Sequence, residues 1–120
     1  MSTTLEEAWP APTEAHVQEA TKRLVRAFRP VRVVVFGSYA RGDARPGSDM
    51  DLLVVLTEVE NKREAAIAMR RVLSDLPVPH DVHVTTPEEI ERRGWIVGTL
   101  LREALHDGRT VYERSEGEAV

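Results

Sequence analysis

The sequence predicts an α/β fold in which amphipathic helices pack on a small β-sheet. Two apolar runs rich in β-branched residues, at residues 33–36 and 50–56, have the pattern of buried strands. A third segment, residues 80–85, alternates between apolar and polar side chains, as a strand with two different faces does. The segments around these runs carry apolar residues at helical spacing, which indicates helices that cover the sheet.

Length and composition point to one compact domain. The chain has 120 residues, enough for a single domain over residues 1–120. Its net charge of −4 lacks the basic excess that nucleic-acid-binding proteins show. There is no cysteine, so neither a disulfide framework nor a thiolate metal site is available. No stretch has the apolar length of a signal peptide or a membrane span, and we expect a soluble cytoplasmic protein.

The first two helices are predicted from capping residues and prolines. Residues 1–12 are expected to form a loose lead-in, within which Trp9 has no predictable contact. The first helix begins at its N-cap, Thr13, and ends before Pro30, because a residue that precedes proline disfavours helical geometry. A second helix is predicted over residues 61–76 with Asn61 as its N-cap.

Two further helices are predicted after the third strand. A short helix over residues 86–93 has Pro87 at its first position and acids in its first turn. A final helix is predicted from Trp95 to about His106. Gly98 would lie inside this helix, at a cost of about 1 kcal/mol relative to alanine. Residues 114–120 are expected to be a frayed tail.

Two acids, Asp49 and Asp51, lie at the start of the second apolar run. Residues two apart in a strand point to the same side, so their carboxylates are expected side by side, with backbones ~6.6 Å apart. Such carboxylates repel each other unless a cation lies between them. Oxygen ligands of this kind suit Mg²⁺, which usually takes one or two carboxylates together with water and substrate phosphates.

The first apolar run ends at Gly37 and Ser38, where a strand is expected to give way to a short helical turn. Free backbone N–H groups at such a turn form an anion site, to which Gly37 gives close access and Ser38 adds a hydroxyl. A Gly-Ser pair alone also occurs in simple turns, and Asp-x-Asp pairs occur on solvent-exposed faces. Their combination between two buried strands predicts a metal–triphosphate site.

The stretch GSYARG at residues 37–42, followed by SDMDL at residues 48–52, resembles the signature of the minimal nucleotidyltransferases. These are the smallest members of the polymerase-β-type nucleotidyltransferase superfamily. The signature is matched without a gap, and the resemblance extends over roughly residues 31–113, although its specific motifs lie only in the first part. It implies the palm-like nucleotidyltransferase fold, with helices packed on a small mixed sheet.

The family also has a third carboxylate on the next core strand, and Asp81 matches that position. The alternative for Asp81 is an exposed acid on an edge strand. His80 and His83 are three apart, so they would point to opposite faces of the strand, and there is no cysteine to complete a zinc site. Both histidines are expected to be structural or peripheral, although His83 lies on the Asp81 side and could reach the site.

The resemblance implies transfer of AMP from ATP to a hydroxyl group, with pyrophosphate as the leaving group. Asp49, Asp51 and Asp81 would hold two Mg²⁺ ions, with Mn²⁺ as the alternative metal, and Asp81 would help to remove the hydroxyl proton. Gly37 and Ser38 would bind the outer phosphates of ATP. Arg41 would contact a phosphate or, alternatively, pair with a surface acid.

The acceptor of the nucleotide is predicted to be a partner protein, because nearly the whole chain is used for the catalytic core. The resemblance implies an antitoxin that adenylylates a tyrosine of a HEPN-domain ribonuclease toxin. One alternative is a small-molecule adenylyltransferase, similar to enzymes that modify aminoglycosides, which would work as a homodimer with a shared pocket. Another is a binding antitoxin that neutralises its partner by contact alone.

Overall fold

The computed structural model describes residues 10–96 and 98–115 and has the predicted α/β architecture. The predictions for residues 1–9, which include Trp9, for Val97 and for residues 116–120 fall outside the described residues. The elements in chain order are α2 (Glu14–Phe28), β1 (Arg32–Phe36), α3 (Ser38–Arg41), β2 (Met50–Val55), α4 (Lys62–Val72), β3 (His80–Thr85), α5 (Pro87–Arg93), α6 (Leu100–Asp107) and β4 (Arg109–Glu113).

The four strands form one mixed sheet in the order β3-β2-β1-β4, which confirms the predicted sheet type. Strand β1 is antiparallel to both β2 and β4, whereas β2 and β3 are parallel and are connected through α4. In the parallel pair, Asp51 is in register with Asp81 and Leu53 with His83. This register brings the acids predicted from two separate motifs onto neighbouring strands.

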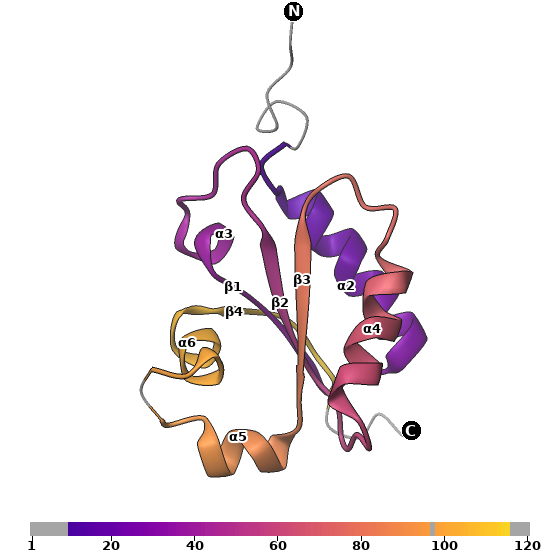
Figure 1. The fold of residues 1–120 in the computed structure, drawn as a ribbon, viewed down its shortest axis with the longest axis vertical. Coiled ribbons are helices and arrows are strands. Elements are labelled where there is room, and N and C mark those ends of the chain that lie inside the picture. The colour runs from indigo at the N-terminus through magenta and orange to yellow at the C-terminus, as the bar shows by residue number, and fades with distance from the viewer. Residues whose placement is uncertain (1–9, 97, 116–120) are drawn as a thin grey trace, which may run out of the picture.

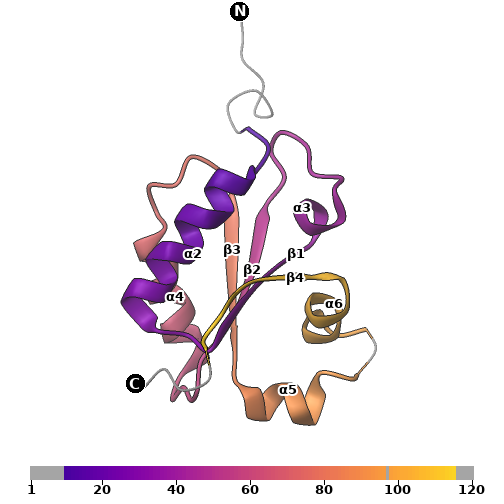
Figure 2. The same ribbon diagram turned by 180° about the vertical axis from the view of Figure 1, so that it is seen from behind.

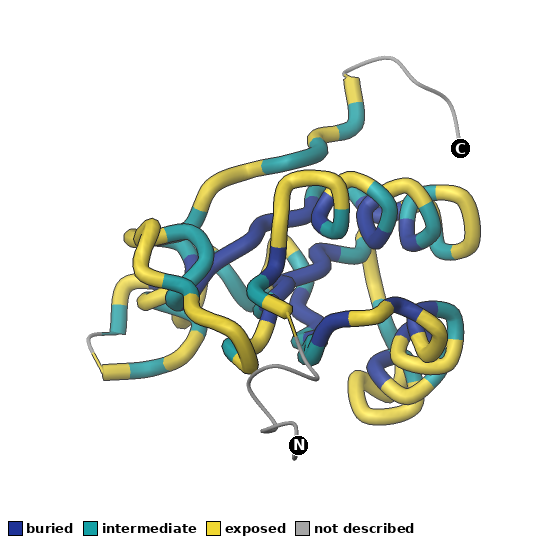
Figure 3. Tube along the Cα trace, turned by 90° about the horizontal axis from the view of Figure 1, so that it is seen from above, coloured by how far each residue is buried: buried dark blue, intermediate teal, exposed yellow. Residues whose placement is uncertain are grey.

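One face of the sheet is covered by α2 and α4, which lie together on the same side (Figures 1 and 2). Their inward residues Val17, Leu24 and Met69 are fully buried against alternate strand residues such as Leu52 and Val54. Figure 3 shows the buried backbone concentrated in the strands and on the inner sides of these helices. This layer is the main hydrophobic core.

The opposite face of the sheet is only partly covered. Helix α6 packs over β1, where Ala104 joins Val34, Phe36 and Leu53 in a small second cluster. Helix α5 lies at the end of β3, away from the start of the strand (Figure 1). At the start of β2 and β3, this face is bordered by the short helix α3, and neither α5 nor α6 extends over Asp51 and Asp81 (Figure 1).

Three of the predicted helix starts are confirmed by their caps. The side chains of Thr13, Asn61 and Thr86 each accept a hydrogen bond from a backbone N–H in the first turn of α2, α4 and α5, respectively. Helix α4 ends at Val72, where the prediction extended it to residue 76, and a turn follows before β3. No helix among the described residues is both long and apolar enough to cross a bilayer.

The predicted start of the final helix is wrong. Helix α6 begins at Leu100, and its N-cap is Thr99, whose Oγ1 accepts a hydrogen bond from the backbone N–H of Arg102 at 3.1 Å. Gly98 has a φ of 91°, which a right-handed helix cannot contain, so it lies in the preceding turn. Trp95, the predicted first residue, lies in the turn that directly follows α5, and it is 71% exposed. Ile96 has the helical spacing of the apolar residues in α6, but it lies before that helix begins.

Candidate active site

The geometry of the site starts from Asp51, the second residue of β2. Its register partners are Phe36 on β1 and Asp81 on β3, so the two carboxylates occupy neighbouring strands at the same level. The flanking residues Met50 and Leu52 point to the other face and are fully buried in the main core. The strand alternation therefore fixes the direction of the half-buried Asp51 side chain.

Asp81 is held by contacts at one of its two carboxylate oxygens. Its Oδ1 accepts a hydrogen bond from Arg70 at 2.8 Å and another from the backbone N–H of Val82 at 2.9 Å. Arg70 projects from α4 and also donates to the carbonyl oxygen of Val82 at 3.2 Å. The second oxygen, Oδ2, lies 3.3 Å from Nε2 of His83. Arg70 thus fixes Asp81 with Oδ2 directed toward the site.

Asp49 lies immediately before β2 rather than inside it, and its side chain is exposed. One ligand atom from each of Asp51, Asp81 and His83 lies within 4.8 Å of the others, a grouping that Asp49 does not share. Asp49 is still near enough for its charge to act on the Asp51 carboxyl group. The structure thus brings Asp51 and Asp81 together and leaves Asp49 at the edge of the site.

The electrostatics of the site fit a divalent cation. Burial, together with the negative charges of Asp49, Asp81 and Glu103, raises the pKa of Asp51 to about 6, against the opposing effect of Arg41. A carboxyl group so perturbed lacks a sufficient positive partner in the protein itself. Oxygen ligands at the mouth of a strand are those that Mg²⁺ and Mn²⁺ accept. The residues present therefore fit the metal that the family resemblance implies.

The turn at Gly37 lies directly against the Asp51 carboxylate. Gly37 is the N-cap of α3 and has a φ of 78° and a ψ of −155°, a conformation essentially restricted to glycine. A methyl group added at this position would overlap Oδ2 and approach Cγ of Asp51 to 3.3 Å. The first backbone N–H groups of α3, beginning at Ser38, have no partner within the helix. The predicted anion site and the predicted metal site are therefore adjacent.

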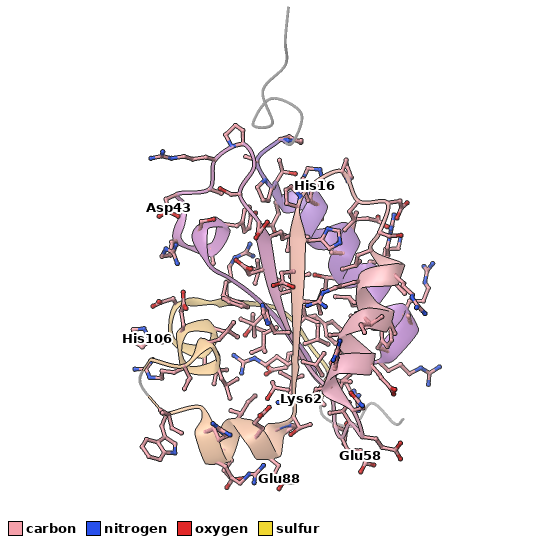
Figure 4. All side chains as sticks on the ribbon, viewed as in Figure 1. His16, Asp43, Glu58, Lys62, Glu88 and His106 are labelled. Carbon is pink, nitrogen blue, oxygen red and sulfur yellow. The ribbon has the colours of Figure 1, made fainter. Side chains whose placement is uncertain are left out.

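Arg41 ends α3 and faces two acids. Its guanidinium lies 3.7 Å from Asp43 and 3.6 Å from Glu103 of α6. Asp43 is labelled in Figure 4, in the loop that follows α3. These contacts correspond to the alternative of a pair with surface acids. The phosphate contact of Arg41 stays a prediction, since its positive charge is also close enough to lower the pKa of Asp51.

Tyr39 ties the signature turn to the rest of the protein. Its hydroxyl donates a hydrogen bond of 2.6 Å to Oε1 of Glu14, the first residue of α2. Arg109 of β4 donates to the same oxygen at 2.7 Å, and this contact, followed by the Tyr39 bond, lowers the pKa of Glu14. Helix α2, α3 and β4 therefore meet at one carboxylate, which fixes the position of the turn that carries Gly37.

A hollow of about 550 Å³ opens on the same face of the sheet as Asp81 and extends toward α5. Leu53, Val84 and Leu101 supply apolar parts of its wall. The charged residues that line it comprise four basic side chains and one acid, namely Lys62, Arg63, Arg70, Arg93 and Glu89. Lys62 pairs with Glu89 at 2.7 Å and is labelled beside β3 in Figure 4. The hollow is thus basic, although the whole chain is acidic.

Sequence reasoning did not assign three of these residues to the site. His83 was expected to be structural or peripheral, although its alternation with Asp81 already placed both on one face. Arg70 belongs to the polar side of an amphipathic helix, and no local pattern distinguishes it from Arg63 or Arg71. Glu103 reaches the site only through the packing of α6 on β1, which a sequence does not reveal.

Comparisons with known proteins agree with this geometry. The sequence profile of the nucleotidyltransferase domain matches residues 17–112. No curated protein sequence matches the chain. A candidate nucleotidyltransferase from Sulfolobus solfataricus shares the fold with a TM-score of 0.59 and 22% identity, over 83% of this chain and 79% of that one.

Two solved toxin–antitoxin structures also share the fold. One is the pair MntA–HpeT carrying a tyrosine-to-alanine mutation, with a TM-score of 0.60 and 18% identity over 82% of this chain and 72% of that one. The other is a toxin–antitoxin with AMP-PNP, with a TM-score of 0.52 and 20% identity over 81% and 73% of the two chains. At these identities the likeness is one of fold, whereas the profile match spans most of the sequence. Because the profile matches residues 17–112 and the Asp51 carboxylate lies against the Gly37 turn, the chain belongs to the nucleotidyltransferase domain family.

Proposed function

We propose that this nucleotidyltransferase transfers AMP from ATP to a tyrosine hydroxyl of a HEPN-domain toxin and thereby acts as an antitoxin. The observation that carries the proposal is the contact between the two halves of the signature. Asp51, in register with Asp81, lies against the backbone of Gly37 at the start of α3. A triphosphate bound at the Gly37 turn would place its reacting phosphate beside both carboxylates.

The nucleotide side of the reaction uses the signature turn. The N–H groups at the start of α3 and the Ser38 hydroxyl would bind the outer phosphates, and Arg41 would turn from Glu103 to a phosphate oxygen. Asp49, Asp51 and Asp81 would hold the divalent ions, which when bound offset the charge that develops on the attacking and leaving oxygens. Transfer of this kind depends mainly on positioning and charge neutralisation, which these residues supply.

The acceptor side of the reaction uses Asp81. The acceptor oxygen forms a bond to the α-phosphorus as the bond to the bridging oxygen of pyrophosphate breaks. The proton of the acceptor hydroxyl would pass to Oδ2 of Asp81, because Arg70 and the N–H of Val82 occupy Oδ1. Proton transfer to a positioned carboxylate typically contributes ~10²–10⁴-fold to the rate.

A protein acceptor is favoured by the shape of the described chain and by its fold neighbours. The site lies beside a basic hollow on the less covered face of the sheet, where the short helix α3 borders the start of β2 (Figure 1). Two structures with this fold come from toxin–antitoxin pairs, one with a mutated tyrosine and one with AMP-PNP. The HEPN identity of the toxin rests on the family resemblance.

The proposal is tested by incubating the purified protein with ATP, Mg²⁺ and the protein encoded by its neighbouring gene, followed by intact-mass and peptide mass spectrometry. We expect the added mass of AMP on a tyrosine of the partner, and no addition with Asp51→Asn. An unmodified partner that is still bound and silenced would instead establish an antitoxin that acts by contact. A partner that neither binds nor changes would overturn the toxin assignment, and small hydroxyl acceptors would become the next screen.

The basic hollow gives a second test of the acceptor. Arg63 and Arg93 line it, and neither forms an ion pair with a described residue. If an acidic surface of the partner docks there, the double variant Arg63→Glu, Arg93→Glu should lower kcat/KM for the protein acceptor about tenfold or more, since like charges at an interface cost several kcal/mol. ATP affinity should not change. Arg71→Glu, on the same helix outside the hollow, is the matched control, and an equal loss in that variant would contradict docking at the hollow.

A further inference from the structure

His83 occupies a position that the transfer chemistry described above leaves unused. It follows Asp81 by two residues on β3, so both side chains project from the same face, and it is in register with Leu53 on β2. Its Nε2 atom lies 3.3 Å from Oδ2 of Asp81. Among the described residues, His83, Asp51 and Asp81 each place one ligand atom within 4.8 Å of the others.

These separations are close to those of a shared metal ion. Ligand atoms on opposite sides of an ion with bonds of 2.0–2.2 Å lie about 4.2 Å apart, and adjacent ones lie closer. Small side-chain rotations would therefore bring all three groups onto one ion. Asp49 lies before β2 and outside this group, so it would contact a metal ion only at the edge of the site, through its carboxylate oxygens.

The imidazole is held in place by an apolar neighbour. Its ring packs on Phe36 with centroids 5.7 Å apart and planes inclined by 51°, and Phe36 itself is buried. Arg70 and the N–H of Val82 meanwhile hold Oδ1 of Asp81, which leaves Oδ2 on the His83 side. Both the nitrogen and the oxygen are thus oriented by groups outside the cluster, as ligands of metal sites usually are.

The charges around the cluster favour a cation rather than a simple histidine–aspartate pair. Asp49 and Glu103 add negative charge near Asp51, whereas Arg70 is already bonded to Asp81 and Arg41 to Asp43 and Glu103. A histidine binds a metal ion as the neutral imidazole, so in a metal site the ion itself offsets the charge of these acids. The nitrogen lone pair of the imidazole suits transition-metal ions better than the hard ion Mg²⁺, and Mn²⁺ is a transition-metal ion that also accepts the carboxylate oxygens.

We propose that His83 is a nitrogen ligand to the metal shared by Asp51 and Asp81, and that it biases this site toward Mn²⁺ over Mg²⁺. This inference deepens the proposed function and rests on it only for what the metal does. The oxygens of Asp51 and Asp81 bind either ion. The nitrogen of His83 strengthens the binding of the ion that accepts mixed oxygen and nitrogen donors.

The test measures metal binding by the full chain without nucleotide. Electron paramagnetic resonance titration gives the Kd for Mn²⁺, and spin-echo modulation detects a directly bound imidazole nitrogen, which protein labelled with the heavy nitrogen isotope in histidine identifies. We expect this nitrogen signal in the native protein and its loss in His83→Gln. The Kd for Mn²⁺ should rise by about tenfold to a hundredfold in that variant, whereas the Kd for Mg²⁺, measured by competition, should change much less.

His80→Gln is the matched control. His80 is on the same strand but points to the other face, where its ring nitrogen lies 2.9 Å from the carbonyl oxygen of Val78. This variant should keep both the nitrogen signal and the Mn²⁺ affinity. Metal-free circular dichroism and thermal unfolding establish that each variant is folded. Should His83→Gln fail to fold, a labelled triple variant with His16, His80 and His106 each replaced by Gln decides the proposal, because His83 is then the one histidine of the sequence.

Three outcomes would overturn the proposal: no Mn²⁺ binding by the native protein, binding without a nitrogen signal, or a signal that persists in His83→Gln. The result is independent of the transferase assignment. Binding through oxygen alone, together with AMP transfer, would remove His83 from the metal site and leave the proposed function intact. Mn²⁺ coupled to the His83 nitrogen, without AMP transfer to any acceptor, would keep His83 in the metal site and contradict the proposed function.

Discussion

The two faces of the sheet divide the work of this protein between stability and chemistry. The face under α2 and α4 is covered, and fifteen buried side chains of the described residues form the main hydrophobic core there. The opposite face has a second cluster of four buried residues beneath α6, and the remainder carries Asp51, Asp81, His83 and the basic hollow. The same strands supply both faces, because their side chains alternate.

The partial exposure of the open face explains why the negative charges of Asp51 and Asp81 can remain without full compensation by cations of the protein. Buried charges cost free energy unless they are paired, and Asp51 is only half-buried at the start of its strand, where this face of the sheet is bordered by the short helix α3. The neighbouring residues Met50 and Leu52 hold β2 in place from the other side. The packed face thus keeps the strand rigid while the open face keeps a group of like charges ready for a cation.

The largest expected effect comes from removing the charge of Asp51. Asp51→Asn should lower AMP transfer by about 10³-fold or more, on the scale that loss of one charge-stabilising group has in phosphoryl transfer. The protein should still fold, since the main core is untouched. Steady-state kinetics with the partner as acceptor measure the first effect, and thermal unfolding measures the second. Full transfer by this variant would remove Asp51 from the site.

In the absence of divalent metal, Asp51→Asn should stabilise the folded protein, although it lowers AMP transfer. The pKa of Asp51 is raised from 3.8 to about 6, chiefly by burial, so the folded state binds this proton more tightly than the unfolded state. The stability of the native protein should therefore fall as the pH rises from about 4 to 6, and remain lowered above that range. Asp51→Asn should unfold at a higher temperature than the native protein at pH 7 and lose this advantage near pH 4. An advantage independent of pH would contradict the assigned cause.

Alanine substitutions at Leu52 and Leu53 compare how much the two faces of β2 contribute to the free energy of unfolding. Both are buried, but Leu52 packs in the main core whereas Leu53 also lines the hollow. Replacing a buried leucine by alanine typically costs about 2–5 kcal/mol, and the cost falls where the site can relax or admit water. We expect Leu52→Ala near the upper end and Leu53→Ala near the lower end in urea unfolding. Equal losses would show that the open face is packed as tightly as the covered one.

The sequence was sufficient for most of the fold because its signals were local. The β-branched runs predicted β1 and β2, the alternation predicted β3, and Thr13 and Asn61 capped the helices as expected. The final helix was misplaced because Gly98 adopts a positive φ that an apolar stripe does not reveal. Strand β4 had no clear alternation, and it forms because β1 offers a free edge for pairing.

The candidate site was predictable only where its residues lie close together in the sequence. Gly37, Ser38, Asp49 and Asp51 belong to one motif, and the contact between Gly37 and Asp51 follows from the antiparallel pairing of β1 with β2. Arg70 and Glu103 come from helices whose position depends on tertiary packing. The basic character of the hollow likewise arises from α4 and α5 meeting beside β3, whereas the overall composition indicated only an acidic chain.

Gly37→Ala tests whether the active site tolerates one added methyl group beside the Asp51 carboxylate. Gly37→Ala should strain the backbone by about 1–3 kcal/mol, because its φ and ψ are essentially restricted to glycine. It should also displace the Asp51 carboxylate, which the new methyl group would overlap, and lower transfer by about 10²-fold. Gly42→Ala is the control: its φ is 85°, but no heavy atom lies within 4 Å of the added carbon. Comparable losses of transfer in both would indicate strain alone rather than displacement of Asp51.

The smallest effect is expected at Tyr39, which links the open face to the first turn of α2. Tyr39→Phe removes the hydrogen bond to Glu14 but keeps the ring, and one such bond contributes about 0.5–1.5 kcal/mol. If the bond positions the signature turn, KM for ATP should rise about threefold while kcat stays nearly constant. The accompanying loss of stability should shrink as the pH falls through the lowered pKa of Glu14, because the protonated acid is a weaker acceptor than the carboxylate. A fall in kcat with an unchanged KM would instead place Tyr39 at the reacting groups, as part of the active site rather than of its support.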